Sequence, residues 1–331
     1  MKRRILTQAL AAAALATAFA GNAQAQAREK VVLLLNWYVY SEHAPFFLGK
    51  DKGFYEAEGI DLEIQEGRGS GVSVQAVAAG SATFGYVDVP TMIRAATKGA
   101  PVKAVGVALQ VSPMAVIGHS DKNIKTPKDI VGKTVAMTPG DAMSQIWPLF
   151  MKKTGLQEGQ YKVVSGDGQT KLNAVINGQA DVLLGYLMDQ NIKIQDATKK
   201  PVSVMRFADY GIELVSSGII ANKDTLSGKA DLVKRFMRAS TRAFEETEKN
   251  PEAAIDAMLK ANAKAGQRDT LIIGIKLTTP LYHTAETKGQ RPLRASMKNI
   301  NDSLDMLVQY GGLDPAARGK AEDWVTNEFL P

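Results

Sequence analysis

Aromatic and imidazole side chains follow directly on a predicted strand near the start of the chain. The apolar run VVLLL at residues 31–35 predicts a buried strand, and Trp37, Tyr38, Tyr40 and His43 come soon after it. An aromatic ring at a strand end can stack on a planar ligand, and a neutral imidazole can both donate and accept a hydrogen bond. The cluster therefore indicates a site for a planar molecule. The alternatives are packing of the rings at a lobe surface and capping of the next helix by His43.

Two glycine-containing loops precede predicted helices and offer a different chemistry. The run EGRGSGVSVQAVAAG at residues 66–80 places Gly69 and Ser70 at a helix start, and TPGDAMSQIWPLF at 138–150 does the same with Pro139, Gly140 and Asp141. The free backbone N–H groups of a first helical turn can donate to a carbonyl, a carboxylate or another polar acceptor. The first loop lacks the GxGxxG spacing of a dinucleotide site. Both loops therefore predict polar ligand contacts, with plain capped helices as the alternative.

Groups that would support catalysis or metal binding form no recognisable arrangement in the sequence. The three histidines are scattered without the spacing of a metal site, and the sequence has no nucleophile elbow or phosphate-binding loop. The chain has no cysteine, which excludes disulfides, thiol catalysis and a lipid anchor on an amino-terminal cysteine. Asp88, Asp189 and Glu213 could lie near a ligand, although acids at strand ends are often only solvated. We expect a binding site without metal or cofactor.

The elements that would position these residues alternate between strands and helices, which predicts an α/β fold with mainly parallel sheets. After residue 224 the pattern becomes almost entirely helical. The expected strands cover residues 30–36, 61–65, 82–87, 102–109, 113–118, 134–137, 161–165, 181–186, 202–206 and 214–221. The expected helices cover residues 45–52, 71–79, 89–98, 127–130, 142–154, 169–177, 188–196, 229–249, 251–262, 268–278, 296–310 and 315–328.

A weak internal repeat relates two helix–strand units. QAVAAGSATFGYVD at residues 75–88 resembles NAVINGQADVLLGYLMD at 173–189, and both contain a glycine helix stop followed by a strand that ends in Gly-Tyr. Ligands in open α/β sheets sit beyond the carboxyl ends of the strands. The repeat therefore predicts two similar lobes, with Tyr86 and Tyr186 facing one gap from opposite sides. Chance similarity is the alternative.

The first 27 residues have the pattern of a secretory signal peptide. KRR at residues 2–4 gives a basic start, an alanine-rich apolar stretch follows, and AQA at 23–25 provides a cleavage site. The apolar stretch is short for a membrane anchor. We expect a mature chain that moves freely in the periplasm.

Charge and length narrow the class of protein further. The formal charge is +6, and the three basic residues of the predicted signal peptide leave 6 − 3 = +3 on the mature chain. This mild excess does not indicate binding to nucleic acid, which requires a concentrated basic face. The remaining chain is long for one hydrophobic core, so two lobes are expected.

Several motifs together resemble the periplasmic substrate-binding proteins of ABC importers. The opening run resembles the binders of thiamine pyrimidine precursors, which are related to fungal pyrimidine-precursor synthases; it contains Leu35-Asn36-Trp37, His43, Lys52-Gly53-Phe54-Tyr55 and Gly59-Ile60-Asp61-Leu62. Later motifs are shared with sulfonate, nitrate and taurine binders; they are Val77-x-x-Gly80-x-Ala82-x-Phe84-Gly85, Gly99-Ala100-Pro101-Val102 and Lys128-Asp129-Ile130-x-Gly132-Lys133-Thr134-Val135. The chain departs from the fungal synthases, because it cannot form their cysteine-rich iron-binding motif.

The resemblance implies a two-lobed type II binding-protein fold with a ligand cleft between lobes joined by two crossover segments. We expect lobe 1 at residues 28–118 and 220–331, and lobe 2 at 119–219. The implied function is capture of a small planar heterocycle, such as a pyrimidine thiamine precursor, by a monomer that delivers it to an ABC permease and its ATPase. The alternatives are a binder of an aliphatic sulfonate, nitrate or aromatic carboxylate, a pyrimidine-forming enzyme, and a sensing module for a membrane kinase. The candidate ligand-binding residues are Trp37, Tyr38, Tyr40, His43, Gly69, Ser70, Tyr86, Asp88, Pro139, Gly140, Asp141, Tyr186, Asp189 and Glu213.

Overall fold

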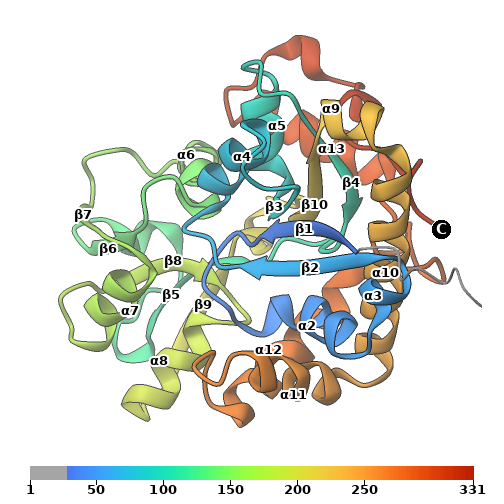
Figure 1. Ribbon diagram of the computed structural model, residues 1–331. Coiled ribbons are helices and arrows are strands. Elements are labelled where there is room, and N and C mark those ends of the chain that lie inside the picture. Colours follow the sequence, from blue (N-terminus) through green and yellow to red (C-terminus); the bar gives the residue numbers. More distant parts are fainter. Residues whose placement is uncertain (1–27) are drawn as a thin grey trace, which may run out of the picture.

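Two five-stranded sheets form the centres of two lobes (Figure 1). The computed structural model describes residues 28–331, so the predicted signal peptide lies outside the described residues. The first sheet has the order β2-β1-β3-β10-β4 and the second β7-β6-β8-β5-β9. The strands are β1 Glu29–Leu34, β2 Ile60–Gln65, β3 Phe84–Asp88, β4 Val102–Val107, β5 Met114–His119, β6 Thr134–Met137, β7 Lys162–Ser165, β8 Val182–Tyr186, β9 Val202–Arg206 and β10 Ser217–Asn222.

The two sheets share one topology, which confirms the predicted α/β fold with two lobes. In each sheet a single strand runs antiparallel to both of its neighbours, β10 in the first sheet and β5 in the second. The strands of the sequence repeat, β3 and β8, occupy the central position of their respective sheets. Their carboxyl ends therefore meet the space between the lobes from two sides.

All ten expected strands are present, with small shifts at their ends. The helices are α2 Ala44–Asp51, α3 Phe54–Ala57, α4 Ser70–Ala78, α5 Val89–Ala96, α6 Ala142–Thr154, α7 Gly168–Ile176, α8 Gln190–Thr198, α9 Lys223–Gly228, α10 Ala230–Lys249, α11 Pro251–Ala261, α12 Arg268–Thr278, α13 Met297–Gln309 and α14 Ala321–Trp324. The short helices α3 and α9 were not expected. The single helix expected over 315–328 is wrong, because Gly319 adopts a left-handed φ of 67° between the turn Pro315–Ala317 and α14.

The chain crosses between the lobes at residues 108–113 and 207–216. The expected boundaries after residues 118 and 219 instead fall inside β5 and β10. β5 pairs with β8 and β9 in the second sheet, and β10 pairs with β3 and β4 in the first. An apolar run predicts a strand but does not show which sheet the strand will join.

Backbone hydrogen bonds tie the two crossover segments to each other. The N–H of Leu109 donates to the carbonyl of Ser217 at 2.9 Å, and the N–H of Ser216 donates to the carbonyl of Leu109 at 2.9 Å. The two crossover segments therefore run side by side as one paired connection between the lobes.

The carboxyl-terminal helices belong to lobe 1 and complete its core (orange to red in Figure 1). Helix α10 buries residues at helical spacing, including Leu232, Phe236 and Ala243, while its other face is charged. The ring of Phe236 stacks on that of Phe84 in β3, with ring centroids 4.0 Å apart. Within residues 28–331, the helices are too short or too polar to span a bilayer.

Truncation of the stacked ring should destabilise the protein. We expect Phe236→Ala to lower the free energy of unfolding by ~3–5 kcal/mol, because it removes a fully buried ring and leaves a cavity against β3. Ile273→Ala is the control, since this side chain is 51% exposed and its loss should change stability by less than about 0.5 kcal/mol. Denaturant unfolding measures both values. Equal stabilities for the two variants would contradict the packing role.

Candidate ligand-binding pocket between the lobes

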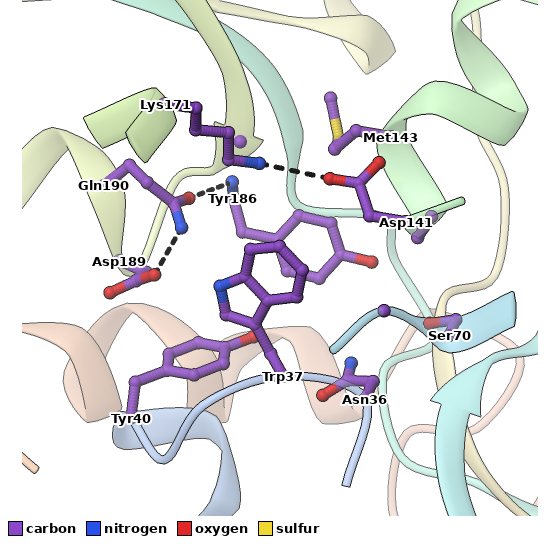
Figure 2. Close-up of a pocket in the computed structure, with 13 residues that line it drawn as sticks. Asn36, Trp37, Tyr40, Ser70, Asp141, Met143, Lys171, Tyr186, Asp189 and Gln190 are labelled. Carbon is purple, nitrogen blue, oxygen red and sulfur yellow. Dashed lines mark hydrogen bonds and ion pairs between the residues drawn. The ribbon is translucent and has the colours of Figure 1, made fainter. Parts of the chain in front are cut away.

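A pocket with a cavity volume of about 40 Å³ lies between the two lobes, at the carboxyl ends of their strands. In lobe 1 the lining residues lie in the segment after β1 and at the start of α4. In lobe 2 they lie after β6, in α7, and at and after the end of β8 (Figure 2). The lining residues are Asn36, Trp37, Tyr40, Gly69, Ser70, Asp141, Ala142, Met143, Lys171, Gly185, Tyr186, Asp189 and Gln190.

The ring of Trp37 lies in the middle of the pocket, between Tyr40 on one side and Tyr186 and Lys171 on the other (Figure 2). Trp37 follows the end of β1, so the strand carries the ring to the lobe boundary. The Lys171 ammonium lies 4.9 Å from the centroid of the indole. This geometry is typical of a cation–π contact and leaves an aromatic wall for a ligand.

Lys171 and Asp141 form a buried ion pair in the lobe 2 wall. The Nζ of Lys171 lies 3.1 Å from Oδ2 of Asp141, and the lysine side chain is only 2% exposed. Lys171 also donates to the carbonyl of Leu184 at 2.8 Å. Asp141 accepts the N–H of Ser144 at 2.7 Å and so caps α6. The pair satisfies both charges inside the protein, which a buried cation requires.

A second set of polar groups joins the lobes beside the pocket. The hydroxyl of Tyr38 in lobe 1 donates to Oδ2 of Asp189 in lobe 2 at 2.5 Å. Gln190 also donates to Asp189 and accepts the N–H of Tyr186, while Lys193 pairs with the other Asp189 oxygen at 2.8 Å. Burial, followed by the charge of Asp189, raises the pKa of Tyr38 well above its usual range. Tyr38 therefore acts as a neutral donor that links the lobes.

His43 lies behind Asn36 and is not among the lining residues. Its Nδ1 accepts the N–H of Tyr40 at 3.4 Å, and its Nε2 is 2.8 Å from Oδ1 of Asn36. These partners require a proton on Nε2, so the imidazole donates to the amide oxygen. Burial, with a smaller contribution from Lys193, lowers the pKa of His43 to about 3. The histidine thus orients the Asn36 amide, and its side chain does not cap helix α2.

Glu42 and Tyr86 lie beneath the pocket and are fully buried. The hydroxyl of Tyr86 donates to Oε1 of Glu42 at 2.9 Å, and the hydroxyl of Tyr40 donates to Oε2. Burial raises the pKa of Glu42. Tyr86 therefore supports Tyr40 through the shared carboxyl group. Tyr186 lines the pocket while Tyr86 does not, so the expectation that both repeat tyrosines face the gap is met by one of them.

Asp88 is fully buried and shapes the pocket from behind Ser70. Its Oδ1 accepts the N–H and hydroxyl of Thr91 at 2.9 and 2.8 Å, which caps α5. Its own N–H donates to the Ser70 hydroxyl at 3.0 Å. Burial raises the pKa of Asp88 to about 6. Asp88 is therefore a structural cap, and Ser70 contributes an oxygen that already accepts one hydrogen bond.

The two predicted helix starts meet each other at the pocket edge. The N–H of Gly71 in lobe 1 donates to the carbonyl of Gly140 in lobe 2 at 3.3 Å. Pro139 and Gly140 do not line the pocket, whereas Gly69, Ser70 and Asp141 do. The loops therefore contribute one lobe-to-lobe contact in addition to lining the pocket.

Seven of the predicted site residues line the pocket: Trp37, Tyr40, Gly69, Ser70, Asp141, Tyr186 and Asp189. Tyr38, His43, Tyr86 and Asp88 are instead in the layer behind it, and Glu213 is exposed in a crossover segment. The sequence reasoning missed Asn36, Ala142, Met143, Lys171, Gly185 and Gln190. Asn36, Ala142, Gly185 and Gln190 adjoin predicted residues, so a one-residue extension would have found these four. Among residues 28–331 no cluster of three metal-ligating side chains occurs.

The buried His43 should make stability depend on pH. The native pKa of about 3 is below the ordinary value of about 6.5, so the stability contributed by the neutral ring is present above pH 6.5 and is lost as pH falls towards 3. Between pH 8 and pH 5 this loss is about 2 kcal/mol. Denaturant unfolding of wild type and His43→Gln at both pH values measures this loss as the difference between the two proteins. The opposite effect of Asp88 is present in both proteins and therefore cancels. Parallel pH profiles would contradict the assignment.

Comparison with known proteins finds relatives that match over most of their length and solved structures that share the fold. The 4-amino-5-hydroxymethyl-2-methylpyrimidine phosphate synthase of Legionella pneumophila is 26% identical over 290 residues, 87% of each chain. The riboflavin-binding protein RibY of Chloroflexus aurantiacus is 27% identical over 326 residues, 97% of this chain and 91% of the relative. The periplasmic nitrate-binding protein NrtA of Synechocystis PCC 6803 shares the fold, with a TM-score of 0.69 at 12% identity over 91% of this chain and 87% of its own.

The family comparison confirms the resemblance inferred from the sequence motifs. The sequence profile described as NMT1/THI5 like matches residues 40–254. This match covers most of both sheets and both crossover segments. The chain therefore belongs to the NMT1/THI5-like family.

Proposed function

We propose that the chain is the solute-binding component of an ABC import system and captures a small, planar, uncharged heterocycle between its lobes. The observation that carries the proposal is the Trp37 ring in the middle of a pocket whose charged groups are paired within the protein. Stacking supplies affinity for a flat ring, and surrounding amides and hydroxyls supply hydrogen bonds.

The internal pairing of charges favours a neutral ligand. The charged lining residues are Lys171, Asp141 and Asp189; the first two pair with each other, and Asp189 pairs with Lys193. A sulfonate, nitrate or carboxylate would have to displace Asp141 from Lys171 and leave a buried carboxylate without its cation. Such a loss costs several kcal/mol. The anion-binding alternatives are therefore disfavoured, although a nitrate-binding protein shares the fold.

The relatives support the ligand class. One is named as a riboflavin-binding protein and another as a pyrimidine phosphate synthase, and both names refer to nitrogen heterocycles. The synthase name keeps an enzymatic role as the second candidate. In this chain the imidazole of His43 is held behind Asn36 by two hydrogen bonds and Lys171 is held by Asp141. Both arrangements suit recognition by a fixed surface. We infer periplasmic delivery to a permease and its ATPase by a monomer.

A thermal-shift screen tests the function directly. Neutral pyrimidines and flavins should raise the melting temperature, because a ligand that binds only the folded state stabilises it, whereas alkanesulfonates, nitrate and aromatic acids should leave it unchanged. Mass spectrometry of the recovered ligand then separates a binder from an enzyme, since a binder returns it unaltered. Stabilisation by anions alone would refute the heterocycle proposal, and product formation would refute the transport role.

Removal of the stacking ring should weaken binding of any ligand found in that screen. We expect Trp37→Ala to reduce affinity about five- to 150-fold, which corresponds to ~1–3 kcal/mol of lost stacking. Trp37→Phe should retain part of the affinity, because a smaller ring still stacks. Isothermal titration calorimetry measures all three proteins. An unchanged dissociation constant in Trp37→Ala would show that this ring only packs.

A further inference from the structure

We propose that three glycines outside the pocket, Gly71, Gly168 and Gly274, set ligand affinity by allowing the lobes to close. They are called the seam glycines below. Each lies in a helix at the edge of the cleft, and at each a single added methyl group would meet the opposite lobe. The inference rests on the proposed function, because it assumes that ligand is held by lobe closure.

Gly168 in lobe 2 gives the tightest contact with a side chain of the opposite lobe. A Cβ at this position would lie 2.6 Å from Cζ2 of Trp37 and 2.9 Å from Cε1 of Tyr38, both in lobe 1. Real Cβ atoms do not approach carbon atoms so closely, so a ring or a lobe would have to shift. Tyr38 is held by Asp189 and Trp37 lies against Lys171, both in lobe 2, so an added methyl group would have to displace a ring from these contacts or move the lobes apart and break them.

Gly71 and Gly274 make the same kind of contact with backbone atoms, which cannot rotate away. A Cβ on Gly71 would lie 2.9 Å from the carbonyl oxygen of Gly140, and outside its own helix it meets no other residue of 28–331 within 4 Å. A Cβ on Gly274 would lie 2.7 Å from the carbonyl oxygen of Met188, but it would also strike Ser41 within its own lobe. Gly71 and Gly168 are therefore the cleaner positions for a test.

Alanine at these two positions should leave each lobe intact. Neither glycine lines the pocket, and neither has a left-handed φ. Both lie in the first turn of a helix, α4 and α7, and alanine is a better helix former than glycine. Gly228 in α9 is a matched control, since it has no left-handed φ and a Cβ there would meet no described residue outside its own helix within 4 Å.

Closure can be followed without ligand by trapping it chemically. The chain has no cysteine, so Val72→Cys and Pro139→Cys introduce a unique pair. Both positions are exposed and they flank the Gly71–Gly140 hydrogen bond across the cleft. A short bis-maleimide should join them whenever the lobes meet. We expect Gly168→Ala in this background to slow cross-linking about tenfold or more, and Gly228→Ala to leave the rate unchanged.

Binding is measured in the chain without the added cysteines. With a heterocycle identified by thermal shift, Gly71→Ala and Gly168→Ala should each weaken affinity about tenfold or more while melting, without ligand, at or above the wild-type temperature. A purely structural role would lower affinity and melting temperature together.

The outcomes separate this inference from the proposed function. Slower cross-linking in Gly168→Ala supports the role of the seam glycines in closure. This holds even if no heterocycle binds the wild-type protein, and in that case only the proposed function fails. If Gly168→Ala cross-links as fast as the Gly228→Ala control, the role of the seam glycines in closure is refuted. The inference is also refuted if both Gly71→Ala and Gly168→Ala bind ligand with wild-type affinity, whatever the cross-linking rate.

Discussion

The ion pair between Lys171 and Asp141 holds together the lobe 2 wall of the pocket, because burying either charge without its partner is costly. Asp141 caps the start of α6, Lys171 projects from α7, and the same ammonium donates to the carbonyl of Leu184 in the middle of β8. One interaction therefore fixes three elements of lobe 2 relative to each other. It also places a cation against the Trp37 ring of lobe 1 without leaving free charge for a ligand.

The fold was largely predictable because its strands are short apolar runs separated by glycine stops and helical spacing. Gly80 and Gly178 both adopt left-handed φ, at 75° and 72°, as the repeat implied. The errors came from information that local pattern does not contain. The sequences of β5 and β10 predict strands but fit either lobe, and only their pairing partners decide which sheet they join.

The site was half predictable, for a related reason. Trp37 and Tyr186 could be found because strand ends in α/β sheets point to ligands. Lys171 could not, since it lies mid-helix and is 30 residues from its partner Asp141. His43 was predicted to bind ligand but lies behind Asn36, and this place depends on the backbone turn at Tyr40, which a residue pattern does not show.

Under the proposed function, the hydrogen bond from Tyr38 to Asp189 would affect how quickly a bound ligand leaves. It joins opposite lobes and is largely shielded from water, so it forms only after they meet. A ligand that enters an open cleft does not encounter it, whereas a ligand that leaves must wait until it breaks. Its contribution therefore falls on the residence time of the complex rather than on the rate of capture. Any transporter that accepts the cargo would have to supply the work of separating this pair.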